Sequence, residues 1–200
     1  MFPNYVWDIA TNEKVLYLTF DDGPTPEITN WTLTTLKKFN AKATFFCIGN
    51  NIEKHPEIFQ NILANEHAIG NHTHNHIKGW KTTSKNYLDN IAIANKVMNY
   101  ELKIESGEKL FRPPYGQITP KQGKGLLELG YKIIMWDVLS FDWEKNVTPE
   151  NCLKNVTSKA TNGSIIVFHD SVKASKNMQF ALPKVLEYYS ERGFKFKSIF

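Results

Sequence analysis

Carboxylate, histidine and arginine side chains that could bind a metal ion or carry protons gather in five short segments of this 200-residue sequence. The segments are TFDDGP at 19–24, HTHNH at 72–76, RPPYG at 112–116, FDW at 141–143 and FHD at 168–170. Carboxylates and imidazoles are common ligands of catalytic divalent metals and common proton carriers in hydrolases. The residue types therefore predict a metal-dependent hydrolase.

The predicted metal ligands are Asp22, His72 and His76. The two histidines are four residues apart, so they can face the same way on a helical turn, while His74 between them would point away. Asp22 would complete a set of two imidazoles and one carboxylate. Such a set, without thiolate, suits one divalent ion: Zn²⁺, with Co²⁺, Ni²⁺ or Fe²⁺ as alternatives.

Asp21 and Arg112 are predicted to act as a pair. Adjacent residues that leave a strand point in different directions, so Asp22 can bind a cation while Asp21 handles a proton. Arg112 stands before two prolines that fix the backbone, and its guanidinium could hold Asp21 ionised and oriented. The same rigid segment could direct the backbone N–H of Tyr115 into the site. A solvated turn and a rigid connector are the structural alternatives for these two segments.

His169 is a candidate general acid, which a nearby carboxylate such as Asp142 could orient and keep basic. Each of these two segments is a weak signal by itself. Asp142 could cap a helix beside a buried Trp143, and His169 could simply end a strand. Their placement together with the other three segments favours a functional role.

Short β-like runs alternate with helical periodicity, which is the pattern of a parallel sheet with crossover helices. The predicted strands are 15–20, 43–48, 67–70, 109–112, 131–138, 164–168 and 195–199. One predicted helix follows the first strand, and the others are 56–65, 84–102, 120–129, 149–160 and 178–192. Pattern alone does not distinguish a barrel from an open doubly wound sheet. Both architectures place function beyond the carboxyl ends of the strands, where the five segments fall.

Composition predicts a single globular domain over residues 1–200, because 42% of the residues are hydrophobic and 22% are charged. A short N-terminal extension at 1–14 is expected ahead of the first predicted strand. The net charge of +4 is spread over many lysines, so no nucleic-acid partner is predicted. Two cysteines make no disulfide framework, and Cys47 lies in an apolar run that predicts burial.

The compartment is expected to be cytoplasmic for the chain as written, because it shows neither a signal-peptide pattern nor a transmembrane segment. An extracytoplasmic location is expected if the chain is a trimmed piece of an exported protein. The sequence leaves the oligomeric state open.

Taken in order, the five segments resemble the motifs of the polysaccharide deacetylase family, the NodB-homology domain of carbohydrate esterase family 4. The resemblance runs from about residue 15 to the carboxyl end. It implies a distorted (β/α) barrel, consistent with the seven predicted parallel strands, and a single domain. It also implies hydrolysis of acetyl groups, foremost N-acetyl groups of an N-acetylglucosamine-containing glycan, with release of acetate. An O-acetyl esterase and a non-catalytic descendant that binds metal or carbohydrate are the alternatives.

The resemblance also implies a role for each matching position. The roles are Asp21 as general base, Asp22, His72 and His76 as metal ligands, Arg112 as the residue that holds the base, Tyr115 as backbone oxyanion donor, Asp142 as the residue that tunes the acid, Trp143 as a wall of the site, Val167 as a wall for the acetyl methyl group, and His169 as general acid.

This chain departs from the family pattern at two positions. Leu139 replaces an aspartate that members often carry, with Asp137 two residues upstream, and Val167 replaces the usual leucine. These departures concern substrate contacts rather than the metal ligands. A metallohydrolase of phosphoesters would need more cationic groups than Arg112 near the site. A purely structural module would not explain why acids and histidines gather at strand ends.

Overall fold

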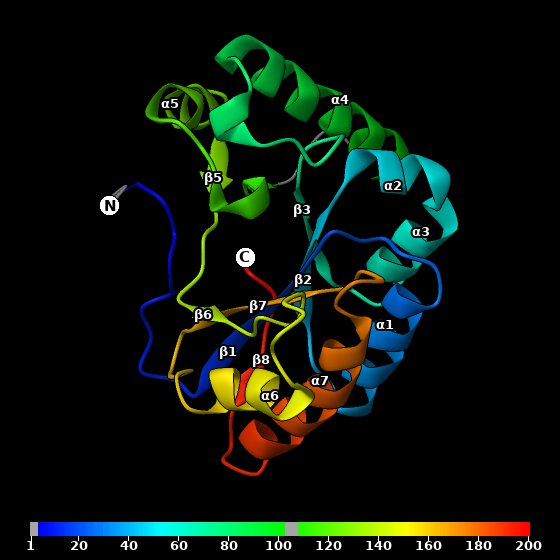
Figure 1. The fold of residues 1–200 in the computed structure, drawn as a ribbon, viewed down its shortest axis with the longest axis vertical. Coiled ribbons are helices and arrows are strands. Elements are labelled where there is room, and N and C mark those ends of the chain that lie inside the picture. Colours follow the sequence, from blue (N-terminus) through cyan, green and yellow to red (C-terminus); the bar gives the residue numbers. More distant parts are fainter. Residues whose placement is uncertain (1–3, 103–107) are drawn as a thin grey trace.

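The structure, a computed structural model, describes residues 4–102 and 108–200. Its parallel strands form one sheet that curls into an incomplete barrel, with helices on the outer side (Figure 1). The strands are β1 Val15–Asp21, β2 Ala43–Cys47, β3 Ala68–Asn71, β4 Lys109–Phe111, β5 Tyr131–Ile133, β6 Val138–Leu139, β7 Ile165–His169 and β8 Lys195–Phe196. Their order is β5-β4-β3-β2-β1-β7-β6, and β8 pairs with the start of β1. The predicted fold class, a distorted (β/α) barrel, is confirmed.

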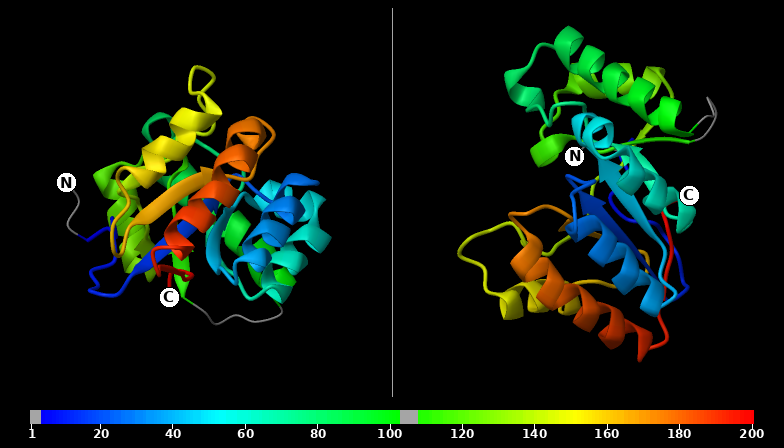
Figure 2. Two further views of the ribbon diagram at one scale, coloured as in Figure 1. Left: turned by 90° about the horizontal axis from the view of Figure 1, so that it is seen from below. Right: turned by 90° about the vertical axis from the view of Figure 1, so that its right-hand side faces the viewer.

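The helices cross between successive strands and cover the outer face of the sheet (Figure 2). They are α1 Ile28–Lys38, α2 Gly49–Lys54, α3 Pro56–Ala64, α4 Ser84–Leu102, α5 Pro120–Glu128, α6 Pro149–Thr157 and α7 Ser175–Ser190, with short 3-10 turns η1 Gly79–Lys81 and η2 Pro114–Gly116. α5 and α6 begin with a threonine cap followed by proline, because the Thr119 and Thr148 hydroxyls each accept a backbone N–H of the first turn. None of the helices in the described ranges combines the length and hydropathy of a membrane span.

The prediction of one strand over residues 131–138 is wrong. The apolar run forms β5 and β6, which lie at opposite ends of the strand order, so residues 134–137 cross the open side of the barrel. Ile134 still donates its N–H to the Phe111 carbonyl of β4 at 2.8 Å but also pairs with Val6, and the carboxylate of Asp137 accepts the N–H of Ile165 at 2.7 Å. The predicted strand 195–199 is also shorter, because β8 ends at Phe196.

The N-terminal segment closes the open side of the barrel. Val6 donates its N–H to the carbonyl of Ile133 at 2.9 Å and accepts the N–H of Met135 at 2.7 Å. Ile9 then donates to the carbonyl of Gly163 at 2.9 Å. Figure 1 shows this segment running beside the chain that joins β5 to β6. The predicted extension at 1–14 therefore contributes hydrogen bonds to the barrel in its described part.

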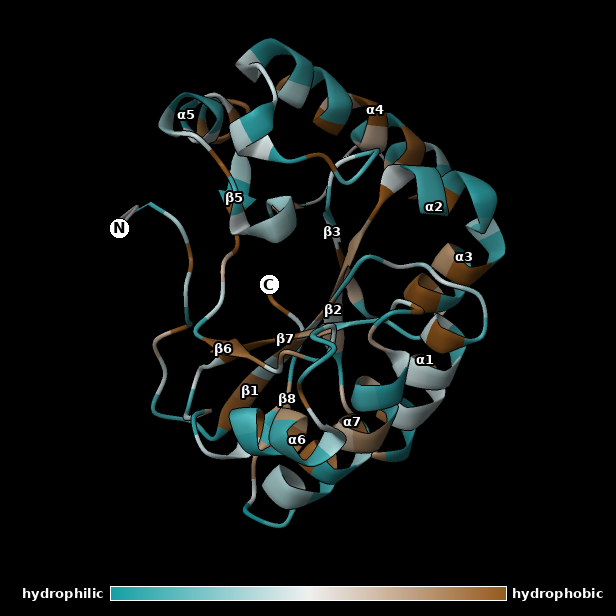
Figure 3. Cartoon of the chain, in the orientation of Figure 1, coloured by the Kyte–Doolittle hydropathy of each residue, from teal (hydrophilic) through white to brown (hydrophobic). Residues whose placement is uncertain are grey.

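Side-chain alternation along β1 separates the outer core from the site. Phe20 faces the helices and stacks between Phe45 and Phe168, with ring centroids at 5.0 and 6.1 Å. Thr19 and Asp21 face the other side, inside the barrel, as the two-residue period of a strand requires. Burying each such aromatic ring stabilises the fold by roughly 1.5–3 kcal/mol. Figure 3 shows β1, β6 and β7 mainly in the colour of hydrophobic residues. The apolar contacts thus hold the strand that presents Asp21.

The two cysteines play no visible part in the site. Cys47 and Cys152 are both buried and unpaired. Burial raises the pKa of the Cys152 thiol to about 12, and it also raises that of Cys47. The predicted burial of Cys47 is confirmed.

Candidate active site

A pocket of about 610 Å³ opens at the carboxyl ends of the strands. Its lining includes eight of the predicted site residues: Asp21, Asp22, His72, His76, Tyr115, Trp143, Val167 and His169. Arg112 and Asp142 lie directly behind it, 0% and 1% exposed. The structure therefore brings the ten predicted site residues into one region, at the rim where the fold class predicts function.

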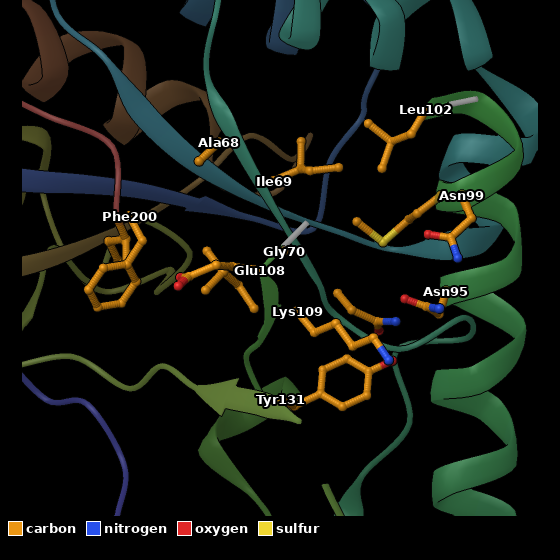
Figure 4. Close-up of a pocket in the computed structure, with 14 residues that line it drawn as sticks. Ala68, Ile69, Gly70, Asn95, Asn99, Leu102, Glu108, Lys109, Tyr131 and Phe200 are labelled. Atoms are coloured by element: carbon orange, nitrogen blue, oxygen red, sulfur yellow. The ribbon is translucent and has the colours of Figure 1, made fainter. Parts of the chain in front are cut away.

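A different pocket of about 310 Å³ opens near the amino ends of β3, β4 and β5. Figure 4 shows Asn95 and Asn99 of α4 on one side of it, and Lys109 and Tyr131 on the other. Its described lining contains none of the predicted site residues. The chemistry of the five segments belongs to the first pocket.

Strand register explains why distant segments meet. Asp21 pairs with His169 across β1 and β7, so the two residues lie side by side. Just beyond them, Gly23 donates its N–H to Asp170, which is 147 positions away along the chain. Asn71, the last residue of β3, pairs with Phe111 of β4, so His72 and Arg112 leave neighbouring strands at the same level. Parallel pairing thus brings four of the five segments to the same edge of the sheet.

The donor atoms of Asp22, His72 and His76 form a cluster that fits a metal ion. One donor atom from each residue lies within 4.8 Å of the others. Asp22 Oδ1 is 3.1 Å from His76 Nε2 and 3.7 Å from His72 Nε2, yet it is buried and accepts no hydrogen bond of good geometry among the described residues. A buried carboxylate oxygen without a donor is unfavourable unless a cation satisfies it. The arrangement therefore fits a divalent ion.

His72 is held in the form that a metal ligand needs. Its Nδ1 lies 2.8 Å from the carbonyl oxygen of Arg112, an acceptor, so Nδ1 carries the proton and Nε2 is free for the cluster. Burial lowers the pKa of His72 to about 4, against the smaller raising effect of Asp21. The imidazole is therefore neutral near pH 7, as metal binding requires.

The histidine segment reaches this arrangement without a helical turn, so that part of the prediction is wrong. Residues 72–78 form a loop in which Thr73 and His76 have φ values of 64° and 52°. Asn71 shapes the loop, because its Oδ1 accepts the N–H of Thr73 at 2.8 Å and its Nδ2 donates to Ile91 at 3.0 Å. His74 points away from the cluster, as predicted, with its Nε2 3.8 Å from Glu53 of α2.

Arg112 holds Asp21 from inside the barrel. Its Nη1 donates to Asp21 Oδ1 at 2.8 Å and to Thr19 Oγ1 at 2.6 Å, and its Nε and Nη2 donate to two backbone carbonyls. The guanidinium also lies over the Phe46 ring, 4.1 Å from its centroid. Burial lowers the pKa of Arg112, and Asp21 opposes that shift. With its side chain 5% exposed, Asp21 is a fixed carboxylate at the pocket wall.

His169 and Asp142 form a second pair on the other side of the pocket. Asp142 Oδ1 is 2.9 Å from His169 Nδ1, and Oδ2 accepts the His169 N–H at 2.7 Å. Burial alone would lower the pKa of His169, but the carboxylates of Asp142, Asp22 and Asp21, with Asp142 the strongest of the three, together raise it to about 9. Trp143 packs edge-on against the imidazole, with ring centroids 4.6 Å apart. The result is a protonated imidazole held in one orientation.

Tyr115 forms the outer wall of the pocket. Its ring is 4.6 Å from that of His76, and Lys78 Nζ lies 4.7 Å from its centroid. The backbone at Tyr115 has φ 60° and ψ 11°, and its N–H donates no hydrogen bond within the described parts of the chain. This N–H is therefore available to a bound molecule.

Asp170 is a site residue that the sequence reasoning did not single out. Its buried carboxylate accepts the Gly23 N–H at 3.1 Å and the Thr29 hydroxyl, while its own N–H donates to Asp21. A Cβ at Gly23 would lie 2.1 Å from Asp170 Oδ2, so only glycine fits there. Asp170 thus fixes the turn that carries Asp21 and Asp22. Its place directly after His169 was the only signal in the sequence.

The two departures from the family pattern lie where substrate would be contacted. Leu139 and Val167 both line the pocket, so this wall is apolar. Asp137 does not replace the missing carboxylate, because its oxygens accept the Ser164 hydroxyl at 2.6 Å and the Ile165 N–H at 2.7 Å, at the start of β7. Trp136, which the sequence reasoning also missed, adds an indole to the lining.

Known proteins resemble the chain over nearly its whole length. A family model described as polysaccharide deacetylase matches residues 8–134. A peptidoglycan-N-acetylglucosamine deacetylase of Bacillus cereus is 32% identical over 195 residues, covering 96% of this chain and 90% of that protein. A crystal structure of a peptidoglycan N-acetylglucosamine deacetylase has a TM-score of 0.91 at 33% identity, covering 98% of this chain and 91% of the other. A mutant, with restored activity, of a CE4 family pseudoenzyme from Bacillus anthracis has a TM-score of 0.88 at 26% identity, covering 100% of this chain and 71% of the other.

Proposed function

The chain belongs to the polysaccharide deacetylase family, and we propose that it hydrolyses N-acetyl groups of N-acetylglucosamine residues in peptidoglycan, releasing acetate. The observation that carries this proposal is the convergence of three metal-binding side chains and two separate proton-carrying pairs on one pocket. The names of the relatives support peptidoglycan as the substrate.

Asp22, His72 and His76 would hold one divalent ion, and we propose zinc, which two imidazoles and a carboxylate suit. When bound, the ion supplies Lewis acidity that polarises the acetyl carbonyl and favours loss of a proton from water. Co²⁺, Ni²⁺ and Fe²⁺ suit the same donors, and metal analysis of the purified protein distinguishes them.

Asp21 and Tyr115 are proposed to act on the attacking water and on the oxyanion. Asp21 takes the proton as the water oxygen bonds to the acetyl carbon, and the hydrogen bond from Arg112 keeps the Asp21 side chain aimed at the pocket. The free N–H of Tyr115 donates to the developing oxyanion, a contribution of roughly 3 kcal/mol to lowering the barrier.

His169 is proposed as the general acid. It gives its proton to the amide nitrogen as the C–N bond breaks, so that acetate and a free amine leave. Its pKa of about 9 keeps it protonated near neutral pH, and Asp142 fixes which nitrogen faces the substrate. The apolar wall of Leu139 and Val167 suits the acetyl methyl group.

A peptidoglycan substrate requires the protein to act outside the cytoplasmic membrane, which is the second of the two expectations for its compartment. Cell fractionation followed by immunodetection tests this part of the proposal. Recovery of the protein in the cytoplasm alone would contradict it.

Acetate release together with metal analysis tests the proposed roles. Asp21→Asn is expected to lose acetate release on peptidoglycan fragments and chitin oligomers while keeping the bound metal, because Asp21 is not in the metal cluster. His72→Ala or His76→Ala is expected to lose the metal itself. Full activity of Asp21→Asn would refute the assignment of the base.

His74→Ala is the matched control, because it removes a histidine of the same segment that points toward α2. It is expected to retain both the metal and the activity. Loss of metal in His74→Ala, comparable to that in His72→Ala, would show that the cluster has been assigned to the wrong imidazoles. A metal-loaded wild type that releases no acetate from any acetylated glycan would favour the non-catalytic alternative.

A further inference from the structure

In addition to the two pockets described above, a hollow of about 260 Å³ adjoins the catalytic pocket. Trp143 and Lys173 line both cavities, so the hollow begins where the catalytic pocket ends. It lies between the loop after β6, the start of α6 and the start of α7. A molecule longer than one sugar could therefore extend from the catalytic pocket past Trp143 into this hollow.

The hollow carries an excess of positive charge. Lys145, Lys173 and Lys176 line it, against one exposed carboxylate, Glu144. Within residues 4–102 and 108–200, none of the three lysine ammonium groups makes an ion pair or hydrogen bond. Asp142 also borders the hollow, but it is buried and engaged by His169. The three ammonium groups are therefore free to bind an anion.

Two helices add to the positive potential of the hollow. Thr148 and Pro149 at the start of α6 line it, as do Lys176 and Asn177 in the first turn of α7. The amino end of a helix carries a partial positive charge and favours anions. Glu150 in the first turn of α6 offsets part of this potential, although it is not among the lining residues. Both helix ends and the lysines therefore make the electrostatic potential of the hollow more positive.

We propose that this hollow is a subsite for a carboxylate on the sugar next to the one that is deacetylated. The inference rests on the proposed function and narrows it, because it makes an anionic N-acetylated glycan a better substrate than a neutral one. The carboxylate forms ion pairs with the lysines, while Trp143 separates it from the reacting acetyl group. Muramic acid carries such a group in its lactyl ether.

The test compares two forms of one oligosaccharide. The first is a peptide-free tetrasaccharide of alternating N-acetylglucosamine and N-acetylmuramic acid, and the second is the same compound with its lactyl carboxylates converted to amides. Acetate release gives kcat/KM for each form at low salt and at about 0.5 M NaCl, where salt strongly screens the attraction between charges. The subsite variant combines three substitutions in one protein: Lys145→Gln, Lys173→Gln and Lys176→Gln.

The control combines Lys38→Gln, Lys54→Gln and Lys96→Gln, which remove the same charge from exposed lysines outside the pockets. Wild type and control are expected to favour the acid over the amide by about five- to tenfold at low salt, a size consistent with several exposed ion pairs. The subsite variant is expected to lose this preference for the acid form. High salt is expected to reduce the preference in wild type and control. Equal use of both forms by wild type, or an unchanged preference in the subsite variant, would overturn the subsite.

A binding measurement separates failure of the subsite from failure of the proposed function. If wild type releases acetate from neither form, the deacetylase proposal fails, and calorimetric binding of the two forms then decides the subsite. Tighter binding of the acid form that is lost in the subsite variant would support it. Equal binding of the acid and the amide would refute it.

Discussion

Replacing Asp142 with asparagine should move the alkaline limb of the pH–rate profile to lower pH. Burial lowers the pKa of His169, but Asp142, by charge and by hydrogen bond, and the charges of Asp22 and Asp21 together raise it to about 9. Asparagine keeps the shape of the side chain but removes the charge. Only the weaker effects of Asp22 and Asp21 then oppose burial, so the pKa of His169 falls toward or below its ordinary value of 6.5.

The size of the effect follows from the fraction of His169 that is protonated. A general acid acts in its protonated form, so activity is lost as pH rises through its pKa. At pH 7.5 a group with a pKa near 9 is almost fully protonated, whereas one with a pKa near 6.5 is protonated in about one molecule of ten. Asp142→Asn should therefore lose about tenfold in kcat/KM at pH 7.5 and recover much of it near pH 6.

The assay is kcat/KM for acetate release from an N-acetylglucosamine oligomer between pH 5 and 10, with the metal content checked at each end. Asp137→Asn is the control, because it also neutralises an aspartate in a neighbouring segment, but an exposed one that bonds Ser164 and Ile165 instead of His169. Its profile should keep the position of the wild-type alkaline limb. An alkaline limb that stays in place in Asp142→Asn, with activity reduced equally at every pH, would refute the assignment of His169 as the acid that Asp142 tunes.

Two further predictions concern the frame that holds the site. Arg112→Met should lower the free energy of unfolding by about 3–5 kcal/mol, because it leaves the Asp21 carboxylate buried without its partner. Urea unfolding should show that adding Asp21→Asn restores part of this loss, and purely additive effects would contradict the coupling. Gly23→Ala should cost roughly 1–3 kcal/mol and weaken metal binding, because its Cβ would lie 2.1 Å from Asp170 Oδ2. The control Gly125→Ala, whose Cβ meets only the flexible end of Leu88 at 3.1 Å, should leave metal binding unchanged, and equal metal affinity in both variants would refute the role of Gly23.

Some tertiary details could not be read from local sequence. The apolar run 131–138 has the composition of a single strand, but its two halves pair with different neighbours, because Val6 and Ser164 supply the competing contacts. His72 and His76 share the spacing of a helical turn, yet Asn71 fixes a loop there by bonding to Thr73 and to Ile91 of α4. In both places, contacts with residues outside the run override its local pattern.

The sequence by itself determined the alternation of most strands and helices, the candidate site residues and the rim on which they stand. These follow from local causes: strand and helix periodicity, and the position of each polar segment directly after an apolar run. Only the tertiary structure decided which partners these residues have. It aligned Asp21 with His169 by register, placed Arg112 against Asp21 and Thr19, and turned Asp170 back onto Gly23. Such contacts depend on strand register and on side chains from separate segments meeting in space, which no local pattern encodes.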